Sequence, residues 1–437
     1  MSRRNLILLI IVLIILSVAV IGYLYSRTPE PAAPGEDTGT NFFSRFNPFG
    51  KSGGNSAPTP TPDTPEPNIP TPDEVAAVKL KKVSTLPIAG YIVFQKERLK
   101  EVPLVPAEEQ TPPASPTKPK APLTEFAPAI RYVERVTGNV YANWADKIDG
   151  YRFTSTEIPK VYEAYFGTKG DAVFMRYLKS DGKTIQTYFG LMPKELLGAD
   201  KSGNSQVKGS FLPEGIGDMS ISPDTAKAFY LFNSGDGVAG VVLDIAGNKK
   251  TQVFDSPFTE WITSWPSAKL ITLTTKASGA VPGYMYAINP DRKDSAFILG
   301  GVSGLTTLTS PSGKLVLYTD SNLSLNIYNI DTKTASALAL RTLPEKCVWG
   351  AGSDVIYCAV PKATPPGSYP DVWYQGEVSF NDQIWKIDVA SGNTTLLIDP
   401  LALGEEIDGI KLALDEKGAY LLFINKKDSI LWELELK

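Results

Sequence analysis

The stretch SPSGKLVLYTDSNLSLNIYNIDTKT, residues 310–334, carries the pattern that decides the fold. A Ser-Pro-Ser-Gly turn precedes an apolar run, and a polar turn separates it from a second run that ends in Ile-Asp. Short runs rich in Val, Ile, Tyr and Phe, bounded by Gly, Asp, Asn and Ser, are typical of β-strands joined by tight turns. The stretch is therefore predicted to form neighbouring strands of one sheet.

The same pattern recurs along the chain with an almost constant period. The turn prolines Pro223, Pro266 and Pro311 are 43 and 45 residues apart. A period of about 40–45 residues that holds four short strands is that of a β-propeller blade. The sequence predicts seven blades, with approximate bounds 88–159, 160–213, 214–257, 258–300, 301–343, 344–404 and 405–437.

The last of these blades has only three strands before the chain ends. We expect VKLKKVST, residues 78–85, to supply the missing outer strand, because such pairing leaves no free sheet edge between the chain ends. The predicted fold class is therefore an all-β, seven-bladed propeller closed by an N-terminal strand. Six or eight blades, or a β-sandwich without a true period, are the structural alternatives.

Three repeat segments resemble a known family. SPDTAKAFYLF, SPSGKLVLYTD and IWKIDVASGN are similar to the repeats of TolB-like propellers, and the resemblance covers most of the chain after residue 78. The overall plan also resembles that of hypothetical exported, membrane-anchored bacterial propeller proteins. The resemblance implies a blade architecture and a periplasmic or surface binding role, but it specifies no activity. The Gly-His and Trp-Asp pairs of WD repeats and the full sialidase box are absent from the sequence.

The N-terminal region is predicted to lie outside the propeller. The run from Leu6 to Leu24 has no charge and follows Arg3 and Arg4. As a helix, at about 1.5 Å per residue, it roughly spans the ~30 Å hydrocarbon core. Residues 1–27 are thus predicted to be a cytoplasmic tip and a single-pass transmembrane anchor, with the rest of the chain extracytoplasmic. Residues 28–77, rich in Pro, Thr and Ser, are predicted to be a disordered tether, and residues 78–437 the propeller.

Composition limits the chemistry that the chain can perform. It contains no histidine, which rules out Ser-His-Asp hydrolysis and histidine-ligated zinc. The net charge of −4 gives no basic field for nucleic acid. No Gly-rich phosphate loop or calcium-loop spacing occurs. We therefore expect no nucleic-acid partner, no metal and no cofactor.

The two cysteines, Cys347 and Cys358, are candidates for a disulfide. If Gly352 and Ser353 form a two-residue hairpin turn, strand register places the cysteines directly opposite each other. An oxidising compartment outside the membrane agrees with this bond. The alternative is a pair of buried thiols.

Two aromatic segments are candidate binding sites. An insertion in the sixth blade, residues 361–385, carries the predicted binding residues, which are Tyr369, Asp371, Trp373, Tyr374 and Gln375. Rigid aromatic side chains beside polar groups suit a peptide or a sugar ring. The alternative is that Trp373 and Tyr374 fold down to plug one face. In the tether, NFFSRFNPFG (residues 41–50) is a predicted docking or membrane-interface motif through Phe42, Phe43, Phe46 and Phe49. The alternative is a local aromatic cluster that packs against the domain.

Catalysis would have to come from carboxylates. The candidates are Asp371, Glu377 and Asp382 in the insertion and Glu405, Glu406 and Asp408 before the last blade. A suitably spaced pair can hydrolyse glycosides. The sequence favours instead a non-enzymatic binding or scaffold module for an envelope protein, a peptide or a glycan. The alternative is a carboxylate-based carbohydrate-active enzyme on the same fold.

Overall fold

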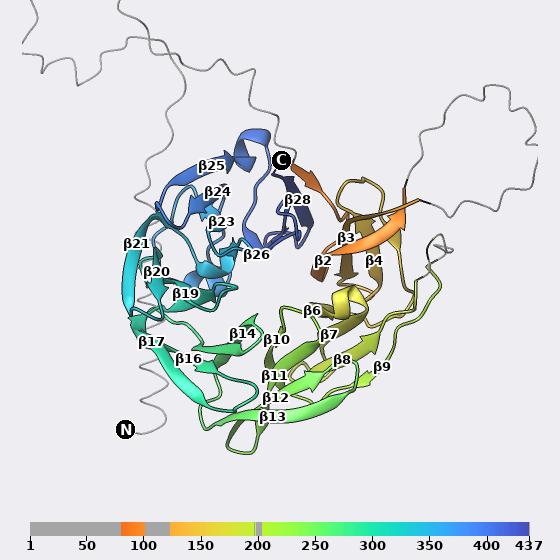
Figure 1. Cartoon of the computed structure of the whole chain (residues 1–437), viewed down its shortest axis with the longest axis horizontal. Helices are drawn as coiled ribbons and strands as arrows, with labels where there is room; N and C mark the ends of the chain where they lie inside the picture. Colours follow the sequence, from red (N-terminus) through yellow and green to blue (C-terminus); the bar gives the residue numbers. More distant parts are fainter. Residues whose placement is uncertain (1–79, 101–122, 196, 198–202, 437) are drawn as a thin grey trace, which may run out of the picture. The chain divides into compact units, whose positions relative to one another are not determined.

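The computed structural model describes residues 80–100, 123–195, 197 and 203–436. Their strands form seven four-stranded antiparallel sheets around a common axis, which confirms the predicted seven-bladed propeller (Figure 1). The anchor predicted from Leu6 to Leu24 and the predicted tether lie outside the described residues. Within the described part of the chain, no helix is long and apolar enough to cross a membrane.

The first three blades follow the predicted order of strands along the chain. Blade one is β2 (Ile88–Leu99), β3 (Thr124–Glu134), β4 (Val140–Trp144) and β5 (Tyr151–Arg152). Blade two is β6 (Val161–Gly167), β7 (Ala172–Leu178), β8 (Ile185–Leu191) and β9 (Lys208–Phe211), with a 3-10 turn, η3 (Thr168–Gly170), between β6 and β7. Blade three is β10 (Ile216–Ile221), β11 (Lys227–Ser234), β12 (Gly237–Asp244) and β13 (Lys249–Ser256).

The remaining blades complete the ring. Blade four is β14 (Trp261–Ser267), β15 (Leu270–Thr275), β16 (Pro282–Ile288) and β17 (Ser295–Ser303); blade five is β18 (Thr306–Thr309), β19 (Leu315–Thr319), β20 (Ser324–Asn329) and β21 (Thr334–Arg341). Blade six is β22 (Cys347–Trp349), β23 (Val355–Pro361), β24 (Asp382–Asp388) and β25 (Thr394–Ile398). Blade seven contains β26 (Gly409–Leu414), β27 (Tyr420–Asn425) and β28 (Leu431–Glu435). Short helices η4 (Pro344–Lys346), α2 (Asp371–Tyr374) and η5 (Pro400–Leu403) belong to blade six or its connections.

The serine of the Ser-Pro turn is structural. Ser310 is fully buried, and its hydroxyl accepts a hydrogen bond of 3.1 Å from the Leu315 backbone N–H. Ser222 does the same for Lys227 at 2.9 Å. Gly313, with a φ of 71°, supplies the left-handed residue that the turn requires. These local bonds close the hairpin between the first two strands of a blade, so the repeat encodes blade geometry rather than chemistry.

Clusters of buried apolar side chains lie between all neighbouring blades. Between blades two and three, Phe174 packs with Tyr230, and between blades seven and one, Leu422 packs with Ile130. The other five blade pairs have equivalent clusters. Each fully buried large apolar side chain stabilises the fold by about 1.5–3 kcal/mol. The core is therefore a ring of seven interfaces, and the first strands of the blades face the axis.

A short strand from the start of the described chain lies beside the last one. β1 (Leu80–Lys82) pairs antiparallel with β28, with Lys81 opposite Glu433. The Lys81 Nζ lies 3.1 Å from the Glu433 carboxylate, which is almost fully buried. Burial raises the pKa of Glu433 to about 7, and the Lys81 charge offsets only part of this effect. At neutral pH the folded protein therefore holds a carboxylate that is costly to ionise.

This carboxylate gives the protein a defined pH dependence. The folded state holds the Glu433 proton more tightly than the unfolded chain, so its contribution to stability falls as the pH rises from about 4.5 to 7. Glu433→Gln cannot ionise, and between pH 5 and pH 8 it should gain on the order of 2 kcal/mol relative to the parent protein. Urea unfolding across this range measures the gain. Parallel pH profiles of the two proteins would contradict the assignment.

Candidate functional site

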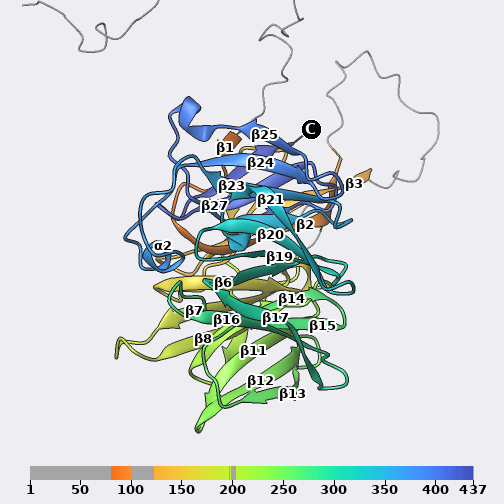
Figure 2. The same cartoon turned by 90° about the vertical axis from the view of Figure 1, so that its left-hand side faces the viewer.

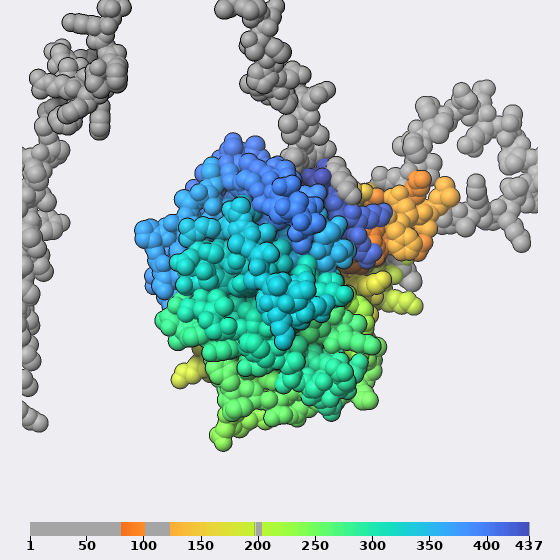
Figure 3. All heavy atoms as spheres, turned by 60° about the vertical axis from the view of Figure 1, so that its left-hand side comes forward, coloured from red at the N-terminus to blue at the C-terminus, as the bar shows by residue number. Residues whose placement is uncertain are grey.

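A groove lies between blades three and four. Its volume is about 630 Å³. One wall is the end of β13 with the connection to β14, and the other is formed by β15, β16 and the connection between them. Figure 3 shows the outer surface of blades three and four in green and teal. The lining residues that the argument uses are Phe254, Asp255, Phe258, Trp261, Tyr284 and Tyr286.

Aromatic rings built around Trp261 form the floor of this groove, which we call the aromatic groove. The Trp261 ring lies edge to face with Phe258 at 5.0 Å, Tyr286 at 5.8 Å and Phe254 at 6.2 Å between centroids. Such edge-to-face pairs contribute about 0.5–1.5 kcal/mol each beyond burial of their area. The Trp261 indole N–H donates to the Phe258 carbonyl at 2.9 Å. Trp261 therefore offers a ligand a ring surface, without a free donor.

Several apolar side chains at the groove are left open to solvent. Phe258 is 45% exposed, Tyr284 40% and Val281 53%, and Phe297, whose ring packs on Tyr286, is 60% exposed. Exposed apolar patches of this kind mark interaction sites in soluble domains. This groove was not predicted from the sequence. Phe254, Phe258 and Trp261 within eight residues were the available signal.

The polar groups at the rim are sparse. Lys276 and Glu260 pair with each other at 3.3 Å, and the Thr275 hydroxyl accepts from the Tyr284 backbone N–H at 3.0 Å. Asp255 is exposed and lines the groove. Among the described residues, no cation forms an ion pair with its carboxylate. The rim thus leaves one negative charge available to a ligand.

The insertion of blade six lies on one face of the ring and carries α2 (Figure 2). Tyr369, Trp373 and Phe380 pack in one buried cluster with Leu323 of blade five and Leu343. The Trp373 ring stacks on Phe380 with 6.2 Å between centroids. This arrangement corresponds to the alternative in which Trp373 folds down onto the propeller.

The structure separates the five predicted binding residues into two groups. Tyr369 is 4% exposed and Trp373 3%, so neither has a surface that could contact a partner in this conformation. Their rings pack the insertion onto the propeller. Direct binding of a partner through these two rings therefore does not fit this structure. Tyr374, at 42%, and Gln375 are exposed. The Tyr374 hydroxyl donates to Glu345 at 2.7 Å.

Asp371, the fifth predicted residue, holds the insertion against the groove. Its Oδ2 accepts a hydrogen bond of 2.7 Å from the Gly279 backbone N–H. Gly279 belongs to the connection between β15 and β16, whose other residues Lys276 and Val281 line the aromatic groove. A Cβ on Gly279 would lie 2.6 Å from the Tyr369 carbonyl oxygen, so only glycine permits this close approach. Asp371 is therefore a positioning residue for one wall of the groove.

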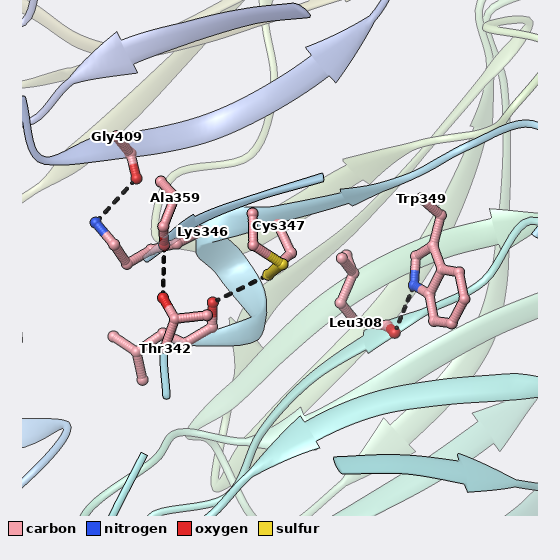
Figure 4. The surroundings of a disulfide bond; sticks show 9 residues. Leu308, Thr342, Lys346, Cys347, Trp349, Ala359 and Gly409 are labelled. Carbon is pink, nitrogen blue, oxygen red and sulfur yellow. Dashed lines mark hydrogen bonds between the residues drawn. A yellow bond between two sulfur atoms is a disulfide. The ribbon is translucent and has the colours of Figure 1, made fainter. Parts of the chain in front are cut away.

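A buried lysine forms ion pairs with two of the candidate catalytic carboxylates. Lys346 is fully buried, and its Nζ lies 2.8 Å from Asp382 and forms a shorter contact with Asp408. It also donates to the Gly409 carbonyl at 3.0 Å (Figure 4). Trp373 and Phe380 cover the ammonium at 5.2 and 5.4 Å from their ring centroids. The three charged groups form an enclosed ion-pair cluster.

This enclosure argues against a catalytic role for these carboxylates. Burial raises the pKa of Asp382 to about 6. Burial also opposes ionisation of Asp408, but Lys346 and the hydrogen bonds from Phe380 and Trp373 outweigh it and lower its pKa. Both side chains have no exposed surface, so no polysaccharide can reach them in this conformation. Of the other candidates, Glu405 pairs with Lys82, Glu406 pairs with Lys427, and Glu377 is exposed.

The two cysteines form a disulfide between the first two strands of blade six, β22 and β23 (Figure 4). Cys347 lies opposite Cys358 and Trp349 opposite Ile356, which is the register predicted from the sequence. The predicted two-residue turn is wrong. Gly350 still pairs with Val355, and Ser353 adopts a left-handed φ of 61°, so the loop is longer. Figure 4 also shows Trp349 donating to the Leu308 carbonyl of blade five, at 3.1 Å.

A second cavity, of about 340 Å³, lies at the ring axis and is lined by the first strands of four blades. Its polar groups are already engaged. Lys411 pairs with Glu163 at 2.8 Å, and the Tyr91 hydroxyl donates to the Lys411 carbonyl at 2.6 Å. No group of three or more acidic, histidine or cysteine side chains suited to a metal occurs in the described part of the chain. The tether residues Phe42, Phe43, Phe46 and Phe49 lie outside the described residues.

Comparison with known proteins does not assign this chain to a family. It matches no protein-family model and no curated protein, so the resemblance to TolB-like propellers stays a prediction. Among solved structures, an oligogalacturonate lyase in complex with manganese is similar with a TM-score of 0.46 and 11% identity, over 71% of this chain and 86% of that one. Hydrazine synthase of Kuenenia stuttgartiensis is similar with a TM-score of 0.42 and 17% identity, over 65% and 78%. Likeness at this level carries no argument about activity.

Proposed function

We propose that this protein is a membrane-anchored, extracytoplasmic propeller that acts as a non-enzymatic binding module. Its aromatic groove takes an extended polypeptide segment with aromatic side chains, presented by an envelope protein. The observation that supports this proposal is the open cluster of edge-to-face rings around Trp261, with Phe258 and Tyr284 exposed at its edge. Several rings that are exposed together in one groove, unlike single exposed rings, are typical of an interaction site.

A polypeptide fits the groove better than a glycan. Sugar recognition combines ring stacking with several hydrogen bonds to hydroxyl groups. In the groove, the Trp261 N–H is used by Phe258, and Lys276 is paired with Glu260. What remains for a ligand is ring surface and the Asp255 carboxylate, which together suit a peptide that carries aromatic side chains and a basic residue. A groove of about 630 Å³ lies within the range of about 300–1,000 Å³ that is typical of ligand sites.

Sequence features support the proposed location. The uncharged run from Leu6 to Leu24 behind Arg3 and Arg4 is that of a transmembrane anchor with the N-terminus in the cytoplasm. The Cys347–Cys358 disulfide is of a kind that persists in an oxidising compartment. The carbohydrate-active alternative is less well supported, because Asp382 and Asp408 are enclosed around Lys346.

A binding experiment with two matched double variants tests this function. Phe258→Ala with Tyr284→Ala removes exposed rings from the groove, whereas Phe126→Ala with Phe211→Ala removes rings of 65% and 57% exposure elsewhere. The probe is a fluorescein-labelled decapeptide with phenylalanine at every third position in a Pro/Ser background. We expect the full-length protein in detergent to bind it, and the groove variant to bind at least about tenfold more weakly, or about 1.4 kcal/mol.

The same titration includes cellohexaose and chitohexaose. Equal peptide affinity of the groove variant and its control contradicts the proposed site. If the oligosaccharides bind and the peptide does not, and if the groove variant loses that binding, the groove is a glycan site instead.

A further inference from the structure

We propose that Asp255 makes the aromatic groove selective for a peptide segment in which an arginine lies next to aromatic residues. This inference rests on the proposed function of the groove and deepens it, because it names the residue that selects the ligand and the side chain that is selected. Asp255 lies between Phe254 and Phe258 in the sequence, and all three line the groove together with Trp261. The carboxylate and the rings therefore belong to one binding surface.

The Asp255 carboxylate is exposed and forms no ion pair with the lysines and arginines of the described propeller. The other charged groups at the rim, Glu260 and Lys276, pair with each other at 3.3 Å. Exposed acidic side chains elsewhere on the ring do have a partner, as Glu406 has in Lys427 at 2.9 Å. Of the described residues that line the groove, Asp255 alone is acidic. A cation that enters with a ligand can therefore pair with this one carboxylate.

The Trp261 ring is likewise without a cation from the chain itself. Three other tryptophans have a cation over their rings, at these distances from the ring centroid: Lys426 over Trp373 at 4.2 Å, Lys82 over Trp432 at 4.8 Å and Arg98 over Trp144 at 5.0 Å. No lysine or arginine in the part of the chain that the structure describes takes this place over Trp261. Tryptophan is the aromatic residue that attracts a cation most strongly. A cationic ligand group would supply this contact at Trp261.

Arginine suits the carboxylate and the rings at the same time. Its guanidinium is planar, so one face stacks on an aromatic ring while its edge donates two parallel hydrogen bonds to a carboxylate. The ammonium of lysine is a compact charge without a flat face, and it is more strongly hydrated. The Trp261 N–H already donates to the Phe258 carbonyl at 2.9 Å. The ring surface and the Asp255 carboxylate are thus the features that a guanidinium matches.

The same carboxylate excludes acidic segments. A glutamate at the position of the arginine would bring two negative charges together beside apolar rings, which solvate neither of them. Aromatic side chains supply affinity in either case, so the charge of the neighbouring residue decides between two otherwise similar segments. The groove is expected to distinguish partners by this charge.

Four forms of one peptide test the selectivity. They share the phenylalanine pattern of the decapeptide probe and carry arginine, lysine, citrulline or glutamate beside the middle phenylalanine. Citrulline keeps the shape of arginine without its charge. We expect the full-length protein in detergent to bind the arginine form at least about fivefold more tightly than the citrulline form, or about 1 kcal/mol. The lysine form should lie between these two, and the glutamate form should bind most weakly.

Asp255→Asn is the test variant, and Asp236→Asn is its matched control. Asp236 is an exposed residue in the turn between β11 and β12 of the same blade. Asp255→Asn should bind the arginine and citrulline forms equally, with its affinity for the citrulline form unchanged, because the rings remain. Asp236→Asn should keep the full preference for arginine.

Several results would overturn the inference. These are equal binding of the arginine and citrulline forms by the parent protein, a lysine form that binds as tightly as the arginine form, and loss of the preference in Asp236→Asn. Loss of citrulline binding in Asp255→Asn would also overturn it, because Asp255 would then only hold the groove in shape.

The uncharged citrulline form keeps the two proposals separate. If it binds the parent protein and loses affinity in the Phe258→Ala, Tyr284→Ala variant, the proposed function stands even when the preference for arginine is absent. If none of the four forms binds, the proposed function is overturned, and the inference that rests on it falls as well.

Discussion

Replacing Lys346 with methionine is expected to destabilise the propeller by about 3–5 kcal/mol, because it leaves two buried carboxylates without their cation. Asp382 and Asp408 have no exposed surface, and Lys346 is the charge that both contact. Methionine keeps the volume of the side chain and removes only the ammonium. The midpoint of urea unfolding, measured at pH 8, reports the loss.

The matched control is Lys362→Met. Lys362 pairs with Asp399 at 2.8 Å, but its side chain is 38% exposed, and such a pair contributes about 0–1 kcal/mol. Adding Asp382→Asn and Asp408→Asn to Lys346→Met should recover much of the loss, because the buried charges are then gone. Equal effects of the Lys346 and Lys362 changes would show that the cluster is not enclosed as described.

Removing both cysteines is expected to lower the stability by about 3 kcal/mol in the oxidised protein. The disulfide joins residues 11 apart in sequence, and a loop of that length gives an entropic contribution of this size. Cys347→Ala with Cys358→Ala is the variant, and Cys347 and Cys358 are both buried, so some loss of packing adds to it. Differential scanning calorimetry of the pair measures the change.

A redox control separates the bond from the packing. The parent protein under reductant should lose most of the same stability, while the double alanine variant should not respond to reductant. Mass mapping that finds two free thiols in protein taken from its native membrane would contradict this prediction. The disulfide would then no longer support an oxidising compartment.

The parts of the fold that depend on local sequence were predictable. The Ser310 turn is closed by hydrogen bonds within five residues, and the register of Cys347 with Cys358 follows from a short hairpin. The period of the turns then gave the number of blades. The loop between the cysteines was mispredicted because a left-handed φ at Ser353, a non-glycine residue, is not signalled by the sequence.

The site depends on contacts between distant segments, and here the sequence was less informative. It could not show which aromatics of the insertion are buried, because Trp373 finds its partners Asp408 and Lys426 in blade seven. Similarly, Lys346 and Asp408 are 62 residues apart. The aromatic groove is assembled from the end of one blade and two hairpin strands of the next, and none of its residues is unusual alone.

A crosslink from the groove side tests the proposed binding role most directly. p-Benzoylphenylalanine is placed at position 258 of the full-length protein in its native membrane, and at position 126 as a control that is more exposed. We predict that position 258 crosslinks an aromatic-bearing polypeptide segment of an envelope protein, well above the control. A yield no higher than at position 126, or adducts to glycan alone, would contradict the assignment of the aromatic groove as a polypeptide-binding site.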